Sequence, residues 1–89
     1  MPEPDTNLLN PTTQALEALL FAAPGLSSVD QLSQALNVSK VEVEKSLEAL
    51  SNHLSSFHGL RLQKIKNQYQ LISAPEHAEK IEKFLGLEI

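Results

Sequence analysis

The chain has 89 residues, of which 42% are apolar and 20% charged, and its net charge is −4. These values are typical of one small globular domain and argue against a disordered chain. The absence of cysteine excludes disulfides, zinc–thiolate sites and a thiol nucleophile, and no apolar run approaches the roughly 20 residues of a membrane span. We therefore expect a folded cytoplasmic protein that does not enter the membrane.

The N-terminal segment leads from a predicted tail into a helix. Residues 1–10 mix proline, aspartate, threonine and asparagine without periodicity, so we expect a flexible tail. Asn10 before Pro11 is a favourable N-cap, which predicts a helix to about Ala23, with Pro24-Gly25 ending it. Its apolar stripe is Leu16, Leu19, Leu20 and Ala23. Phe21 falls off that stripe, so either the helix is buried on a second side or Phe21 contacts a partner.

Two further helix starts follow in close succession. Ser28 with Gln31, and Ser39 with Glu42, have the spacing of capping boxes. Apolar residues then recur at helical spacing: Val29, Leu32, Ala35 and Leu36 in the first segment, and Val43, Leu47, Leu50 and Leu54 in the second. Asn37 tolerates the left-handed conformation that a tight turn between helices needs. The pattern predicts a helix-turn-helix.

The basic stretch that comes next, LRLQKIKNQYQLIS, is predicted to form a β-hairpin. Its apolar residues alternate in each half, and a two-residue turn at Asn67-Gln68 would place Lys66 opposite Tyr69 and Lys64 opposite Leu71. One face then carries the side chains that would cover the helices: Leu60, Leu62, Tyr69 and Leu71. Ile65 and Ile72 lie on the other face.

A last helix is predicted from near Pro75 to Gly86, with Ala78, Ile81, Phe84 and Leu85 along one side. With a short strand near Leu26, the elements make a mainly α winged helix-turn-helix domain over residues 11–86. The hairpin is its wing, and the last helix closes the fold. Residues 87–89 are expected to be the chain end or the start of a linker.

A winged helix suggests DNA binding, which the distribution of charge can test. The outward face of the predicted second helix of the turn is acidic, because it carries Glu42, Glu44, Lys45, Glu48 and Asn52. Such a face would repel phosphates. The wing carries Arg61, Lys64 and Lys66 and no acid between residues 60 and 73. These cations either make a few weak phosphate contacts or only discourage strand-to-strand aggregation.

Residues suited to catalysis or metal binding do not form a recognisable pattern. No two of His53, His58 and His77 are four residues apart, and His53 and His58 straddle the expected end of a helix. The glutamates at 42, 44 and 48 lie on a solvated face, and the chain has no glycine-rich phosphate loop. The sequence predicts neither an active site nor a cofactor nor a metal site.

Several segments, in this order, carry a family resemblance: LEALLF (16–21), QLSQALNVS (31–39), GLRLQKI (59–65), YQLIS (69–73) and KFLG (83–86). Together they resemble the N-terminal winged-helix domain of bacterial segregation and condensation protein B, ScpB. The resemblance implies a non-enzymatic, nucleoid-associated subunit that forms homodimers and binds the kleisin ScpA, which bridges the heads of the SMC ATPase. Two positions depart from the family pattern. Asn67-Gln68 stands where the family commonly has a glycine-rich wing turn, and Ser27 stands where we expect an apolar strand residue. ScpB-like proteins have a second winged-helix domain, so we expect this chain to be a fragment or a one-domain relative.

The remaining apolar residues are candidates for self-association. Ile65 and Ile72 on the outer wing face are the first candidates, and Phe21 and Phe84 are lesser ones. Alternatively, the two isoleucines pack beneath the last helix. A different function also stays open, that of a sequence-specific transcriptional regulator that reads DNA with residues 39–56 and the wing.

Overall fold

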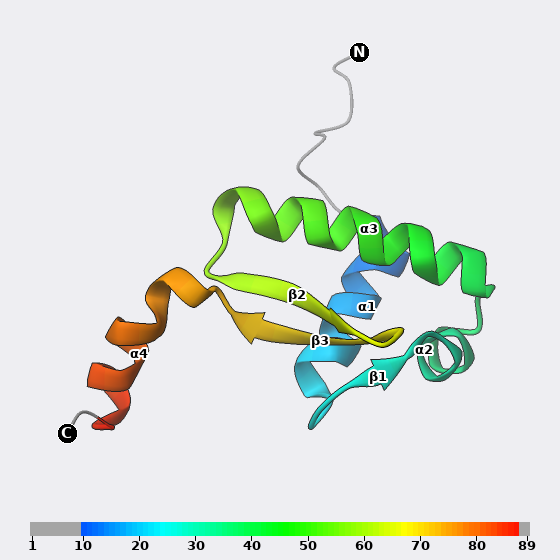
Figure 1. The fold of residues 1–89 in the computed structure, drawn as a ribbon. Coiled ribbons are helices and arrows are strands. Elements are labelled where there is room, and N and C mark those ends of the chain that lie inside the picture. Colours follow the sequence, from blue (N-terminus) through cyan, green and yellow to red (C-terminus); the bar gives the residue numbers. More distant parts are fainter. Residues whose placement is uncertain (1–9, 88–89) are drawn as a thin grey trace, which may run out of the picture.

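The computed structural model describes residues 10–87. Its elements are α1 (Pro11–Ala22), β1 (Ser27–Ser28), α2 (Val29–Leu36), α3 (Lys40–Phe57), β2 (Leu60–Ile65), β3 (Gln68–Ser73), the 3-10 turn η1 (Pro75–His77) and α4 (Ala78–Leu85). The three strands form an antiparallel sheet in the order β1-β3-β2, beside the bundle of α1, α2 and α3 (Figure 1). This is the predicted winged helix-turn-helix. Apart from Asn10, the predicted tail lies outside the described residues, as do the last two residues of the predicted linker.

The helix starts follow the predicted caps. The Asn10 side chain accepts a hydrogen bond of 2.8 Å from the backbone N–H of Thr13 at the start of α1. At α2 the capping box is complete, because Ser28 Oγ accepts from the Gln31 N–H and Gln31 Oε1 accepts from the Ser28 N–H. Asn37 ends α2 in the left-handed region, with φ 55° and ψ 46°. These bonds satisfy helix-end groups that would otherwise lack partners.

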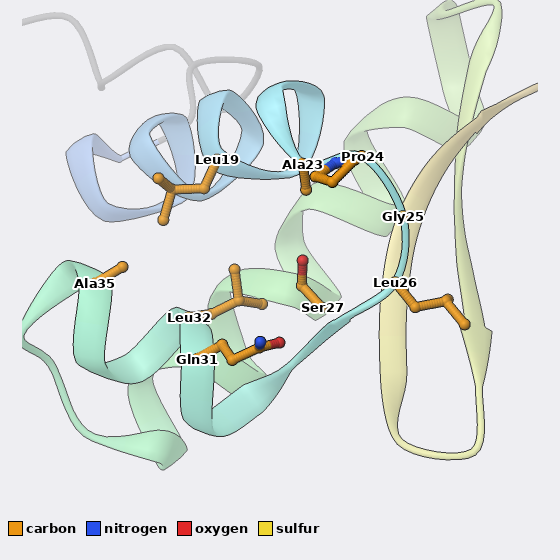
Figure 2. A pocket seen from close by; sticks show the side chains of 9 residues that line it. All are labelled: Leu19, Ala23, Pro24, Gly25, Leu26, Ser27, Gln31, Leu32 and Ala35. Atoms are coloured by element: carbon orange, nitrogen blue, oxygen red, sulfur yellow. The ribbon is translucent and has the colours of Figure 1, made fainter.

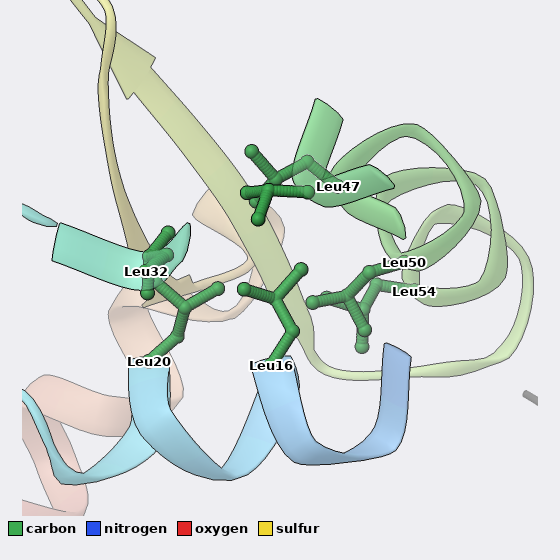
Figure 3. Packing of buried hydrophobic residues seen from close by; sticks show 7 residues of the cluster. Leu16, Leu20, Leu32, Leu47, Leu50 and Leu54 are labelled. Carbon is green, nitrogen blue, oxygen red and sulfur yellow. The ribbon is translucent and has the colours of Figure 1, made fainter. Parts of the chain in front are cut away.

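The core lies where the three helices meet and is made of branched aliphatic side chains. Its buried cluster is Leu16, Leu20, Leu32, Val43, Leu47, Leu50 and Leu54, six of which are labelled in Figure 3. Leu62, Tyr69 and Leu71 of the hairpin are half-buried against this cluster, so one face of the wing covers the helices as predicted. Leu60 takes less part in this cover, because it is 39% exposed.

The register of the hairpin differs from the prediction by two residues. The turn is Lys66-Asn67 instead of Asn67-Gln68, so Lys64 and not Lys66 lies opposite Tyr69, and Leu62 and not Lys64 lies opposite Leu71. The observed register joins two leucines across the strands, which stabilises a sheet better than a leucine opposite a lysine. A slip of two residues leaves each side chain on its predicted face. The third strand is Ser27–Ser28, just after the predicted Leu26.

A substitution that removes backbone strain from the wing turn tests where this turn lies. Lys66 and Asn67 have φ values of 49° and 66°, a conformation that costs lysine more than asparagine. Lys66→Asn should therefore raise the free energy of unfolding by about 0.5–1 kcal/mol, measured by urea denaturation. Lys64→Asn, in the neighbouring strand, removes the same charge and should not stabilise. Equal stabilisation by both variants would contradict the assigned turn.

The last helix does not close the fold as predicted. In Figure 1, α4 extends away from the helical bundle after η1, and its closest neighbour in space is η1. Phe84 and Leu85 are 87% and 57% exposed and Ile81 is half-buried, so the domain leaves the C-terminal part of the apolar side of α4 uncovered. The alternative in which Ile65 packs beneath this helix is wrong, because Ile65 lies beside the wing turn, at the opposite end of the hairpin from α4.

Candidate protein-binding surfaces

All three phenylalanines of the chain are on the surface. Phe21, Phe57 and Phe84 are 81%, 78% and 87% exposed, whereas the buried hydrophobic residues are leucine, valine and alanine. The interpretation that Phe21 is buried on a second side of α1 is therefore wrong. Sequence reasoning did not single out Phe57, which continues the apolar spacing of α3 three residues after Leu54 but is exposed because it is the last residue of the helix. Phenylalanine is usually buried inside a folded domain, so exposed phenylalanines are typical of surfaces that bind another protein.

Phe21 borders a shallow groove between α1 and the wing. The groove has a volume of about 250 Å³ and is lined by Gln14, Glu17, Ala18, Phe21, Leu60 and Leu71. We call it the Phe21 groove. Ala18 leaves room on α1, while the two leucines come from the inner faces of β2 and β3. Its apolar lining and exposed ring suit the burial of another apolar side chain.

The outer face of the wing carries polar as well as apolar side chains. Ile72 lies opposite Arg61 at one end of the hairpin, and Ile65 lies opposite Gln68 at the other. Between them, Gln70 Nε2 donates a hydrogen bond of 2.8 Å to Gln63 Oε1. Ile65 is 41% exposed, and Ile72 is half-buried. The two isoleucines are thus separated by a polar pair and do not form one apolar patch.

Arg61, predicted as a possible DNA contact, is held within the domain. Its Nη1 donates to the backbone oxygens of Leu54, His58 and Leu60 at 3.1, 2.5 and 2.8 Å. Its Nη2 lies 2.9 Å from Glu76 Oε1 in an ion pair. The guanidinium therefore joins the end of α3, the start of β2 and η1. Backbone oxygens and the Glu76 carboxylate thus occupy both terminal nitrogens, which opposes a phosphate contact.

Removal of this guanidinium tests its structural role. Arg61→Met keeps much of the apolar stem but leaves the carbonyls without their donor, so the free energy of unfolding should fall by about 1–3 kcal/mol. Urea denaturation followed by circular dichroism measures the change. Lys66→Met removes one cation from the wing turn and should change stability by less than about 0.5 kcal/mol. If Arg61→Met weakens duplex binding but leaves stability unchanged, Arg61 is a DNA contact instead.

The other cations offer little to a DNA backbone. Lys40 Nζ lies 2.6 Å from Asp30 Oδ1, and this hydrogen bond and the negative charge of Asp30 raise the pKa of Lys40. Lys64 Nζ lies 5.9 Å from the ring centroid of Tyr69, and Lys66 is exposed in the turn. Glu44 and Glu48 are exposed on α3, and Glu42 is half-buried there. The helix that would enter a major groove thus presents negative charge.

A second hollow lies between α1 and α2 (Figure 2) and has a volume of about 470 Å³. Leu19, Leu32 and Ala35 project into it from the two helices, and the loop from Ala23 to Ser27 forms its end. The only polar side chains in its lining are those of Ser27 and Gln31, and Gln31 Oε1 already caps α2. A small-molecule site normally has several convergent polar groups, which this hollow lacks.

The described part of the chain shows no group of three or more histidine, cysteine or acidic side chains placed to hold a metal ion. Within residues 10–87, no helix has the length and hydrophobicity to cross a bilayer. The structure does, however, bring His53 and His58 together, although their spacing of five residues indicated two separate side chains. Their Nε2 atoms are 3.0 Å apart.

Comparison with known proteins decides the family. Residues 14–88 match the family described as segregation and condensation complex subunit ScpB. The chain belongs to the ScpB family. It is 36% identical over 73 residues to segregation and condensation protein B of Alkaliphilus oremlandii and 40% identical over 65 residues to that of Syntrophotalea carbinolica. These matches cover 81% and 72% of the chain, and 40% and 33% of the two relatives, so the chain spans less than half of their length.

A solved structure extends this family assignment to three dimensions. The fold is similar to that of a crystallised dimer of an ScpB N-terminal domain complexed with an ScpA peptide, with a TM-score of 0.77 and 30% sequence identity. The match covers 84% of this chain and 88% of the crystallised one. The family resemblance and the fold predicted from the sequence are thus confirmed.

Proposed function

We propose that this chain is a non-enzymatic subunit of a bacterial chromosome segregation and condensation complex, where it forms a homodimer and binds the kleisin ScpA. The observation that carries this proposal is the similarity, over most of both chains, to an ScpB N-terminal domain that was crystallised as a dimer with an ScpA peptide. Through ScpA the subunit would join the SMC ATPase, in the cytoplasm and at the nucleoid. The surface chemistry supports contacts with proteins, because apolar side chains are exposed and the face of α3 that would meet DNA is acidic.

The exposed phenylalanines are the best candidates for the dimer surface. Phe21 offers a ring beside an apolar groove, and Phe84 offers one on the uncovered side of α4. In a symmetric dimer both copies use the same patch, so the dimer would bury two copies of each ring, one from each chain. Ile65 is a secondary candidate because it is partly exposed near the wing turn. Half-buried Ile72 is the weakest of the four, since little of its surface remains to be covered.

The alternative of a sequence-specific transcriptional regulator has less support. Arg61 is engaged inside the domain and Lys40 is paired with Asp30, which leaves Lys64 and Lys66 as the wing cations that face solvent. Two cations make few phosphate contacts, and such binding weakens steeply as salt rises. Direct contact with nucleic acid is therefore proposed to be weak or absent.

The mass of the protein in solution tests the proposal. Light scattering on a sizing column should give twice the mass of one chain, and addition of an ScpA fragment from the same genome should give a heavier complex. Duplex DNA at physiological salt should not co-elute with the protein. A monomer that ignores ScpA but binds a specific duplex at that salt would overturn the proposal in favour of a regulator.

A further inference from the structure

The end of α3 carries two imidazoles that face one another. Besides the 3.0 Å between the Nε2 atoms of His53 and His58, the ring centroids are 4.7 Å apart and the ring planes are inclined by 43°. Two rings that met head-on across this nitrogen–nitrogen distance would have their centroids further apart. The rings therefore meet at an angle instead of head-on. Two imidazoles that bind one ion also meet at an angle.

The backbone at the helix end explains this approach. In a continuous helix, residues five apart lie on different faces, so the spacing alone predicts no contact. His58 is not helical, because its φ of −124° and ψ of 154° are those of an extended residue. The chain turns there into β2, while His53 stays one turn inside α3. This change of direction brings the two side chains to the same side of the helix end.

Two neutral imidazoles at this distance either share a hydrogen or share a cation. For a shared cation, each ring carries its proton on Nδ1 and directs the lone pair of Nε2 to the ion. Imidazole nitrogens bind Cu²⁺, Ni²⁺ and Zn²⁺ at about 2.0 Å, with nitrogen–metal–nitrogen angles of about 90–110°. A spacing of 3.0 Å between the nitrogens fits these values.

The surroundings favour a cation as well. The last carbonyls of α3 lie at the negative end of the helix dipole, which attracts positive charge. Both histidines are accessible, since His58 is exposed and His53 is half-exposed. Arg61, which donates to the His58 carbonyl, is the nearby positive group, and Glu76 offsets its charge.

We propose that His53 and His58 form a two-histidine site for a divalent transition-metal ion. Water completes the coordination, because the described residues supply no third ligand at this place. The bound ion links the C-terminal part of α3 to His58, which lies in the short connection between α3 and β2. It therefore stabilises the junction between the helix-turn-helix and the wing, whether or not the protein forms a dimer.

The test uses the untagged 89-residue chain, because a histidine tag would bind the same ions. Calorimetric titration should show one Cu²⁺ per chain, weaker binding of Zn²⁺ and none of Mg²⁺, which prefers oxygen ligands. Removal of an outer-shell partner of a metal ligand typically lowers the affinity about 10- to 100-fold. His53→Gln and His58→Gln each remove a ligand itself, so each should lower the affinity for Cu²⁺ by at least this factor. The matched control is His77→Gln, which removes the remaining histidine and should bind as wild type does.

A second readout separates the site from nonspecific binding. Zn²⁺ should raise the melting temperature of the wild type and of His77→Gln, but not that of His53→Gln or His58→Gln, since only binding to the folded state stabilises. Without metal, the four proteins should have closely similar far-UV circular dichroism. The proposal is overturned if His53→Gln keeps wild-type affinity, or if His77→Gln loses as much affinity as the variants of the pair.

Discussion

Leu50→Ala should lower the free energy of unfolding by about 2–5 kcal/mol, the range measured when a buried leucine is truncated in a packed core. Leu50 is 0% exposed and lies in α3 opposite the buried side chains of α1 (Figure 3). Truncation loses its apolar burial and leaves a cavity that the helices cannot fill completely. For a domain of this size a loss of 2–5 kcal/mol is a large part of the total stability of about 5–15 kcal/mol.

Urea denaturation, with the slope compared between variants, measures this loss. Val41→Ala is the matched control, because Val41 lies in the same helix but is 60% exposed. Its stability should change by no more than about 0.5 kcal/mol. Equal losses in both variants would mean that burial of Leu50 in the core does not account for the effect, since alanine is the best helix former and replacing either residue by it cannot weaken the helix through propensity.

Phe21→Ser should convert the proposed dimer to a monomer at concentrations where the wild type is dimeric. An aromatic side chain at the centre of an interface typically contributes about 2 kcal/mol or more, which is roughly a 30-fold change in Kd. In a symmetric dimer the substitution is present twice, so the effect on Kd is larger. Folding should be nearly unaffected, because Phe21 is 81% exposed. Sedimentation velocity over a range of concentrations measures the change.

Two companion variants show which surface is involved. Phe84→Ser tests the apolar side of α4, a helix that extends away from α1 and the rest of the bundle (Figure 1). Val41→Ser removes an exposed apolar residue of α3 and should leave the dimer intact. If Phe21→Ser and Phe84→Ser both remain dimers, the dimer surface lies elsewhere, and Ile65→Lys becomes the next test. Unfolding of Ile65→Lys would assign Ile65 to the fold rather than to an interface.

Much of the fold could be predicted because its determinants are local. Caps at Asn10, Ser28 and Ser39 act within three residues, and apolar periodicity shows which side of each helix turns inward. Alternation in the wing likewise predicted the correct faces. A two-residue error in register did not change those faces, because side chains repeat every two residues along a strand. The family could be recognised from the same segments, since their order along the chain is itself a sequence property.

The functional surfaces depended on contacts between distant residues. The spacing of apolar residues cannot show that α4 leaves the bundle, because its amphipathic pattern only indicates that it needs some partner. It also cannot show that Arg61 faces three backbone carbonyls and a carboxylate, or that His53 meets His58 where the helix ends. Local hydrogen bonds and periodicity set the helices and the faces of the strands. Which groups meet is decided when those elements pack, because that step brings together side chains whose positions no local pattern specifies.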